Sequence, residues 1–267
     1  MKKGVKTISE KFWKKIDIFL LILFPVLATI ISLLFKTSIF ISIILFFGLP
    51  SIYLSYRTKH MVKKTLLFSL IVSISSTVII DYFLTFNKIW FVSTIFPFRL
   101  PLGIPLEDPI WFFLFPFSVI LFYEHFLDKG KHELIDKKMK YFIWPLLIIT
   151  LILLLLFVVN PLLLKVRYAY LWIGIILILF PLVTFLSAFP RLLSKYVKTA
   201  TYFFALNLMY ELVAMKLNQW TWPSNSEYIG MVQLFGLSFP FEEFFFYIVL
   251  ATTALLSYYE FFDDDRK

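Results

Sequence analysis

Long apolar segments separated by short polar segments run along the whole chain. A helix that spans the hydrocarbon core of a membrane needs roughly 20 apolar residues. Eight segments have about that length, at residues 16–35, 37–56, 65–84, 107–127, 142–160, 168–189, 199–217 and 241–262. The pattern predicts an all-α integral membrane helical bundle with about eight transmembrane helices.

Composition supports this prediction and narrows the possible chemistry. The 267 residues are 60% hydrophobic and only 16% charged, whereas soluble domains are about 45–50% apolar. The absence of cysteine excludes disulfides, thiolate metal sites and cysteine nucleophiles. The three histidines lie in or beside basic loops, and no glycine-rich nucleotide-binding pattern occurs. We therefore expect neither a metal nor an organic cofactor.

The net charge of +9 is unevenly distributed. Most lysines and arginines lie in the N-terminal segment, the C-terminus and the loops at 57–64, 128–141 and 190–198. These segments share one side if the eight spans alternate in direction, and basic loops stay in the cytoplasm. The sequence therefore predicts a multi-pass cell-membrane protein with both termini cytoplasmic. The basic charge is explained by topology, without nucleic acid as a partner.

Two segments of the chain have nearly the same sequence. Residues 104–113 read Ile-Pro-Leu-Glu-Asp-Pro-Ile-Trp-Phe-Phe, and residues 239–248 read Phe-Pro-Phe-Glu-Glu-Phe-Phe-Phe-Tyr-Ile. In each, a proline is followed two residues later by two adjacent acids and then by an aromatic run. Carboxylates next to a membrane span are costly and are usually functional. The duplicated motif therefore marks candidate chemistry.

A second pair of positions precedes each acid motif. Asp81 and Trp90 recur 130 positions later as Glu211 and Trp220. The sequence therefore predicts a tandem repeat of two four-helix halves.

The first half comprises residues 1–130 and the second residues 131–267. Four helices per half is an even number, so both halves enter the membrane in the same direction, related by a pseudo-twofold axis along the membrane normal. All the motif acids then lie near the outer ends of helices, where we expect them to converge in one cavity.

The acid, the tryptophan and the motif Pro-x-Glu-(Glu/Asp), present twice, resemble the membrane lycopene cyclase family. That family occurs as two-subunit bacterial enzymes and as fused archaeal and fungal ones, and the resemblance covers nearly the whole chain. Two departures are Pro109 after the first acid pair and Glu211 in place of the family's aspartate.

The resemblance implies a function. The expected activity is a carotenoid end-group cyclase, an intramolecular lyase or isomerase that closes the ends of lycopene-type carotenes into rings of the β-ionone type. The substrate would be a lipophilic carotenoid taken from the bilayer. The resemblance also leaves room for association with other carotenoid-pathway enzymes.

Such a reaction needs a protonated carboxyl group, a base and aromatic faces around a carbocation. A dry site favours the protonated form of a carboxyl group, and paired carboxyls divide into an acid and a base. Aromatic rings stabilise a desolvated cation. The candidate catalytic residues are Asp81, Glu107, Asp108, Glu211, Glu242 and Glu243. The candidate substrate-binding residues are Trp90, Trp111, Phe112, Trp220, Trp222 and Phe244.

Other interpretations remain open on these residues. Acids in the first turn of a helix also complement its dipole and cap free N–H groups. Aromatic residues also line membrane interfaces. A tandem repeat with paired acids also fits a proton-coupled membrane transporter, and the aromatic lining fits a non-catalytic carotenoid-binding membrane protein.

Overall fold

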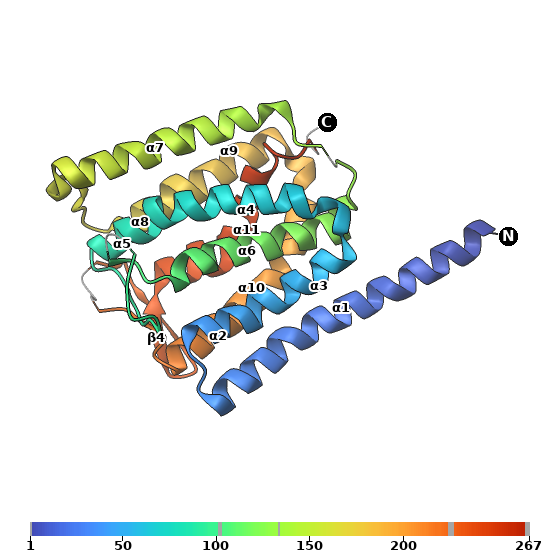
Figure 1. Cartoon of the computed structure of the whole chain (residues 1–267), viewed down its shortest axis with the longest axis horizontal. Helices are drawn as coiled ribbons and strands as arrows, with labels where there is room; N and C mark the ends of the chain where they lie inside the picture. The colour runs from blue at the N-terminus through green and yellow to red at the C-terminus, as the bar shows by residue number, and fades with distance from the viewer. Residues whose placement is uncertain (1, 101–102, 133, 224–226, 265–267) are drawn as a thin grey trace.

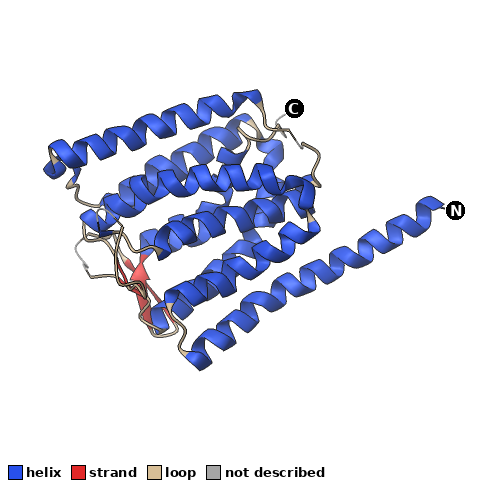
Figure 2. Cartoon of the chain, in the orientation of Figure 1, coloured by secondary structure: helices blue, strands red, loops and turns tan. Residues whose placement is uncertain are grey.

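The computed structural model describes residues 2–100, 103–132, 134–223 and 227–264 and is a helical bundle (Figures 1 and 2). Six helices in this part of the chain are long and apolar enough to cross a membrane. They are Phe12–Phe35, Ile39–Arg57, Lys59–Phe86, Glu107–Asp128, Lys137–Val159 and Ala169–Ala188. The chain is therefore a helical membrane protein. The other two predicted spans are helical too, but one carries several charges and the other, Glu243–Tyr259, is shorter.

Most spans are built from consecutive helical elements. In chain order these are α1 (Lys2–Phe35), α2 (Ile39–Ile43), η1 (Ile44–Gly48), α3 (Leu49–Arg57), η2 (Lys59–Met61), α4 (Val62–Ser76), η3 (Thr77–Tyr82), α5 (Phe83–Phe86), α6 (Glu107–Tyr123), η5 (Glu124–Asp128), η6 (Lys137–Met139), α7 (Lys140–Val159), η7 (Pro161–Leu164), α8 (Ala169–Ile173), η8 (Gly174–Leu179), α9 (Phe180–Ala188), η9 (Pro190–Leu192), α10 (Leu193–Lys216), η10 (Glu243–Leu250) and α11 (Ala251–Tyr259).

Five of these elements are π-helical turns within longer helices, namely η1, η3, η5, η8 and η10. A π-turn inserts an extra residue, widens the helix and re-aims its side chains, and such turns often occur at functional sites. Asp81 lies in η3, and Glu243 is the first residue of η10. Two of the candidate acids thus sit where the helix departs from regular geometry.

In the described part of the chain, four short strands add to the predicted all-α fold (Figure 2). β1 (Phe91–Val92) pairs antiparallel with β2 (Trp220–Thr221), and β3 (Met231–Leu234) forms a hairpin with β4 (Leu237–Pro240). The strands are two to four residues long and lie in interhelical loops. Strands this short show no detectable alternation of apolar and polar residues in the sequence. The β1–β2 pair also joins segments far apart in the chain.

The two ends of the bundle differ in character. All four strands lie at one end, called here the strand end. The start of α1 and the segment after α11 lie at the other, called here the terminal end (Figures 1 and 2). This arrangement puts the segments that follow η3 and α10, and those that precede α6 and η10, together at the strand end.

Helix α6 occupies the centre of the bundle. Its second half is almost fully buried, from Phe115 to Tyr123, and it packs against α4, α3, α10 and α11. In contrast, α7 exposes large apolar side chains such as Trp144, Leu151 and Val158. A helix that is apolar all round suits a lipid environment. Helix α6 is therefore the central helix against which the others pack, and α7 lies at the periphery (Figure 1).

Candidate active site

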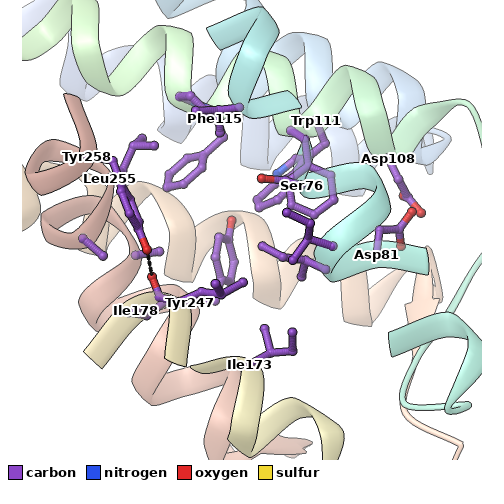
Figure 3. A pocket seen from close by; sticks show the side chains of 18 of the residues that line it. Ser76, Asp81, Asp108, Trp111, Phe115, Ile173, Ile178, Tyr247, Leu255 and Tyr258 are labelled. Carbon is purple, nitrogen blue, oxygen red and sulfur yellow. Dashed lines mark hydrogen bonds between the residues drawn. The ribbon is translucent and has the colours of Figure 1, made fainter. Parts of the chain in front are cut away.

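A cavity of about 400 Å³ lies between the central and peripheral helices. Its walls come from α2, α4 and η3, α6, α7, α8 and η8, α10, and the continuous helix formed by η10 and α11. Carboxyl groups lie at the strand end of the cavity, and the rest of the lining is aromatic or aliphatic apart from a few hydroxyl groups (Figure 3). The cavity is thus an apolar space with acids at one end.

Asp81 and Asp108 meet at the strand end of the cavity. Both side chains are buried, and their carboxyl groups face each other (Figure 3). Asp81 Oδ1 accepts from Trp90 Nε1 at 3.2 Å and from Thr85 Oγ1 at 3.4 Å. Two carboxyl groups that share an apolar site cannot easily both carry a charge, because like charges repel. This pair is therefore arranged to hold a proton in an apolar site.

Glu243 reaches the same cavity from η10. Its Oε2 accepts a hydrogen bond from the hydroxyl of Tyr170, which is at the start of α8. Glu211, on α10, is buried nearby, and its Oε1 accepts from Trp220 Nε1 at 3.0 Å. Glu211 does not line the cavity, whereas Trp220 does. Hence three candidate acids line one cavity, and a fourth contacts it through an indole.

The two acid–indole pairs have the same form. Trp90 donates to Asp81, and Trp220 donates to Glu211, each from nine positions further along the chain. The antiparallel pairing of β1 and β2, with Val92 opposite Trp220, holds the two segments side by side. The structure therefore brings together the four positions that the sequence matched at a constant spacing.

Glu107 and Glu242 lie outside the cavity lining. Glu107 accepts from the Ile95 backbone N–H at 2.9 Å and from the Thr94 hydroxyl at 2.8 Å. Glu242 accepts from the Ile229 backbone N–H at 2.8 Å. In both motifs the first acid bonds the preceding loop, and the second acid faces the cavity. The structure thus distinguishes a loop-binding acid from a cavity-facing acid, which the sequence of adjacent acids could not do.

Five of the six candidate substrate-binding aromatics line the cavity, namely Trp90, Trp111, Phe112, Trp220 and Trp222. Phe244 does not, and its ring lies near Phe204 and Phe239 instead. The indole of Trp90 makes edge contacts with the rings of Tyr170 and Trp222. Aromatic faces therefore surround the acids closely.

Two polar cavity residues beside the acids were missed by the sequence analysis. Tyr170 bonds Glu243, and Tyr210 lines the cavity beside the acids from the position before Glu211. Neither belongs to the duplicated motifs. The only available signal was that a hydroxyl group within an apolar span usually has a partner when buried.

We compared the chain with known protein families, curated proteins and solved structures, and no significant match was found. The functional argument therefore rests on the residues and their geometry.

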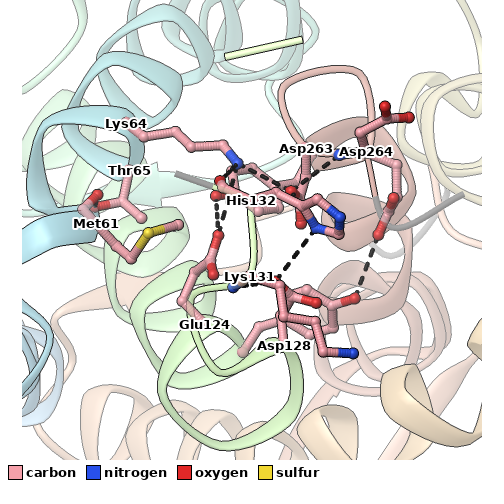
Figure 4. A network of polar contacts seen from close by, with 12 residues as sticks. Met61, Lys64, Thr65, Glu124, Asp128, Lys131, His132, Asp263 and Asp264 are labelled. Atoms are coloured by element: carbon pink, nitrogen blue, oxygen red, sulfur yellow. Dashed lines mark hydrogen bonds and ion pairs between the residues drawn. The ribbon is translucent and has the colours of Figure 1, made fainter. Parts of the chain in front are cut away.

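A second polar cluster lies at the terminal end of the bundle (Figure 4). The Lys64 Nζ atom is 2.9 Å from Asp263 Oδ1 and donates to the His132 carbonyl at 2.6 Å. Lys195 Nζ lies 3.3 Å from Asp128 Oδ1. Lys64 was assigned to a basic loop by the sequence, yet it is buried in α4 because Asp263 provides a counter-charge.

Two tyrosine–glutamate bonds accompany these ion pairs. The Tyr123 hydroxyl donates to Glu260 Oε1 at 3.3 Å, and the Tyr259 hydroxyl donates to Glu124 Oε1. Each tyrosine precedes the glutamate that accepts from the other tyrosine. The end of α6 and the end of α11 are thus joined by a reciprocal exchange of side chains.

The same cluster includes the atoms best placed to bind a cation. Ligand atoms of Asp128, His132 and Asp263 lie within 4.8 Å of one another. However, both carboxylates are already paired with ammonium groups, those of Lys195 and Lys64. Burial raises the pKa of Asp263, and the nearby Lys64 ammonium opposes that change. The cluster is built as an ion-pair network.

Proposed function

We propose that this protein is a carotenoid end-group cyclase that performs an acid-initiated, non-redox cyclisation. The observation on which the proposal depends is the pair of buried, facing carboxyl groups of Asp81 and Asp108 at the end of an aromatic, apolar cavity. Protonation of an alkene requires a protonated acid kept away from water. A lycopene-type carotene end would be a suitable substrate, because it is a lipophilic alkene without polar groups.

In the proposed reaction the Asp81–Asp108 pair is the acid. Its proton adds to the terminal double bond, and a tertiary carbocation forms. The electrons of a neighbouring double bond attack this cation, so that a carbon–carbon bond closes a six-membered ring. Loss of a ring proton then restores a double bond. One proton is gained and one is lost, so the product is an isomer of the substrate.

Glu243 is the proposed base. Its Oε2 accepts a hydrogen bond from the Tyr170 hydroxyl, which holds this carboxyl group in place at the cavity. The two roles therefore fall to different carboxyl groups facing one cavity. Return of the proton from Glu243 to the aspartate pair completes the cycle.

Aromatic residues stabilise the proposed cation. The rings of Trp90, Trp111 and Trp222 line the cavity beside the acids, and a desolvated cation–π contact contributes roughly 2 kcal/mol. An apolar lining also keeps out water that would trap the cation as an alcohol.

We further propose that the chain is a tandem repeat with eight membrane-spanning helices. The matched Trp–acid pairs and the reciprocal Tyr–Glu bonds support two equivalent halves, 1–130 and 131–267. The basic loops then place the terminal end at the cytoplasm and the acids toward the outer side. The protein would be a multi-pass protein of the cell membrane.

Expression in a bacterium that accumulates lycopene tests the function. A cyclase converts the acyclic pigment to ring-containing products, which chromatography of the extracted pigments separates. A carotenoid-binding protein would hold lycopene without changing it. A proton-coupled transporter would neither convert lycopene nor bind it. Unchanged lycopene in cells that contain the folded protein contradicts the proposal.

A further inference from the structure

We infer that the middle of the cavity contains a binding site for a carbonyl oxygen, and that the protein therefore binds a lipophilic ketone or quinone. The site is a group of hydrogen-bond donors, called here the donor cluster, formed by the hydroxyl groups of Tyr210 and Tyr247 and the indole N–H of Trp111. The proposed reaction uses the carboxyl groups and the aromatic faces of the cavity but none of these donors. The inference thus goes beyond that reaction and holds whether or not the protein catalyses it.

Each donor atom of the cluster is buried and has no hydrogen-bond partner in the part of the chain that the structure describes. Tyr210 is fully buried, Tyr247 is 8% exposed, and both line the cavity, as Trp111 does. The indole N–H of Trp222, also in the lining, is in the same condition. Buried donors are nearly always bonded, and leaving one unbonded is costly. An acceptor for the donor cluster therefore has to come from a molecule in the cavity.

The donor cluster is separate from the carboxyl groups. Three of the acids already accept from other aromatic donors, namely Asp81 from Trp90, Glu211 from Trp220 and Glu243 from Tyr170. Trp111 follows Asp108 by three positions on α6. Tyr247 follows Glu243 by four positions on η10. These steps keep side chains on the same face of a helix and move them along its axis by roughly 5 Å. The cluster therefore lies about one helical turn from the acids, toward the terminal end.

The members of the donor cluster come from three helices and lie close together. The rings of Trp111 and Tyr247 meet edge to face, with their centroids 5.2 Å apart (Figure 3). The ring of Phe47 makes edge contacts with Tyr210 on α10 and with Trp111, at centroid distances of 5.0 Å and 6.3 Å. A carbonyl oxygen has two lone pairs and can accept from two donors at once.

The charge and polarity of the lining select the kind of acceptor. No lysine, arginine or histidine among the described residues lines the cavity, so a buried carboxylate or phosphate would have no counter-charge. An indole N–H only donates, and a carbonyl oxygen only accepts, whereas a ligand hydroxyl brings a further donor that needs its own acceptor. The rest of the lining is mainly aromatic and aliphatic, which suits a lipophilic body. A ketone or a quinone combines these properties.

The experiment measures binding of three probes to the purified protein in detergent: a polyene ketone, the polyene hydrocarbon with the same carbon skeleton, and an isoprenoid quinone. We expect the ketone to bind roughly tenfold more tightly than the hydrocarbon. The carbonyl stretching vibration of the bound ketone should shift to lower frequency, because a hydrogen bond weakens the C=O bond. The quinone distinguishes the two sources of the carbonyl group. Tighter binding of the quinone than of the ketone assigns the site to quinones, and the reverse order assigns it to polyene ketones.

Two variants remove one donor each and keep the ring. We expect Tyr210→Phe and Tyr247→Phe each to lower the affinity for the carbonyl probe by roughly three- to tenfold, to reduce the vibrational shift, and to spare hydrocarbon binding. Tyr258→Phe is the matched control. Tyr258 also lines the cavity, but its hydroxyl already donates to the Leu177 carbonyl at 2.8 Å, so the preference for the carbonyl probe should persist. If one of the two donor variants does not fold, the other tests the same site.

Equal affinity of the unaltered protein for all three probes would overturn the site, because water would then be the partner of the donors. A preference for the carbonyl probe that persists in folded Tyr210→Phe and Tyr247→Phe variants would overturn it too. A protein that binds the ketone with the shifted vibration but converts no lycopene has this site and lacks the proposed cyclase function. Conversion of lycopene without any preference for a carbonyl group gives the opposite result.

Discussion

The ammonium group of Lys64 lies 2.9 Å from the carboxylate of Asp263, although 199 positions separate the two residues. Both side chains are almost fully buried. The pair therefore ties the third predicted span to the segment that follows the last one. Lys195 and Asp128 make the corresponding contact in the opposite sense, from the second half to the first.

Removal of one partner from this buried pair should be strongly destabilising. We expect Lys64→Met to lower the free energy of unfolding by about 3–5 kcal/mol, because the Asp263 carboxylate stays buried without its counter-charge. Denaturant unfolding in detergent measures the change. Lys63→Met is the matched control, since Lys63 is exposed. Equal stability of the two variants would contradict a structural role for the ion pair.

The effect of Lys64→Met should depend on pH. Burial raises the pKa of Asp263 in the folded state, and Lys64 limits that rise. Without Lys64 the folded state holds the Asp263 proton more tightly than the unfolded state. A group with a raised folded pKa adds stability that is full below its unfolded value of about 3.9 and is lost as pH rises through the folded pKa. The defect should therefore shrink on acidification, in unfolding curves compared across pH.

The two acids of the first motif should behave differently when each is neutralised. Asp108→Asn removes the proposed donor, and we expect product formation to fall by roughly 10²–10⁴-fold. Glu107→Gln affects a loop contact instead, and should cost about 1 kcal/mol of stability while turnover persists. Pigment analysis normalised to protein level distinguishes the variants. Full activity of Asp108→Asn would remove the aspartate pair from the mechanism.

If acids from both halves act in a single cavity, neutralising either acid should block formation of both rings. Asp108 and Glu243 line the same space, so Asp108→Asn and Glu243→Gln should each stop the first ring as well as the second. No one-ring product should accumulate with either variant. Two separate sites, one for each substrate end, would instead give a one-ring product from at least one variant, which chromatography would detect.

The strand end and the terminal end should be accessible from opposite sides of the membrane. The chain contains no cysteine, so single cysteines can be introduced without background. Phe235→Cys, in the exposed β3–β4 hairpin, should react with an impermeant thiol reagent added outside intact cells. Lys137→Cys, before α7, should react only after the cells are opened. The reverse pattern would invert the proposed orientation.

The sequence predicted the helical elements, and it matched two acid–tryptophan pairs, for clear physical reasons. Membrane-length apolar runs identify helices almost regardless of context, and the spacing of Asp81 with Trp90 and of Glu211 with Trp220 was a local signal. Both indole–carboxyl bonds are present in the structure.

Other features could not be read from the chain, because they depend on contacts between distant segments. Adjacent acids such as Glu242 and Glu243 have similar side chains, and only the fold directs one to Ile229 and the other to Tyr170. Lys64 looked like a loop residue because its partner is far away in sequence. Strands β1 and β2 are too short to show a pattern and gain stability only from each other.

The reciprocal contacts at the terminal end also have a consequence for biogenesis. When α6 leaves the ribosome, Lys64 and Asp128 are already synthesised, whereas Asp263 and Lys195 are not. Until then the nearest carboxylate to the Lys64 ammonium is that of Glu124, 3.9 Å away, and an incompletely paired charge is costly to bury. Translation of the last helix supplies the closer counter-charge of Asp263, at 2.9 Å. Completion of the chain should therefore favour closure of the bundle at this end.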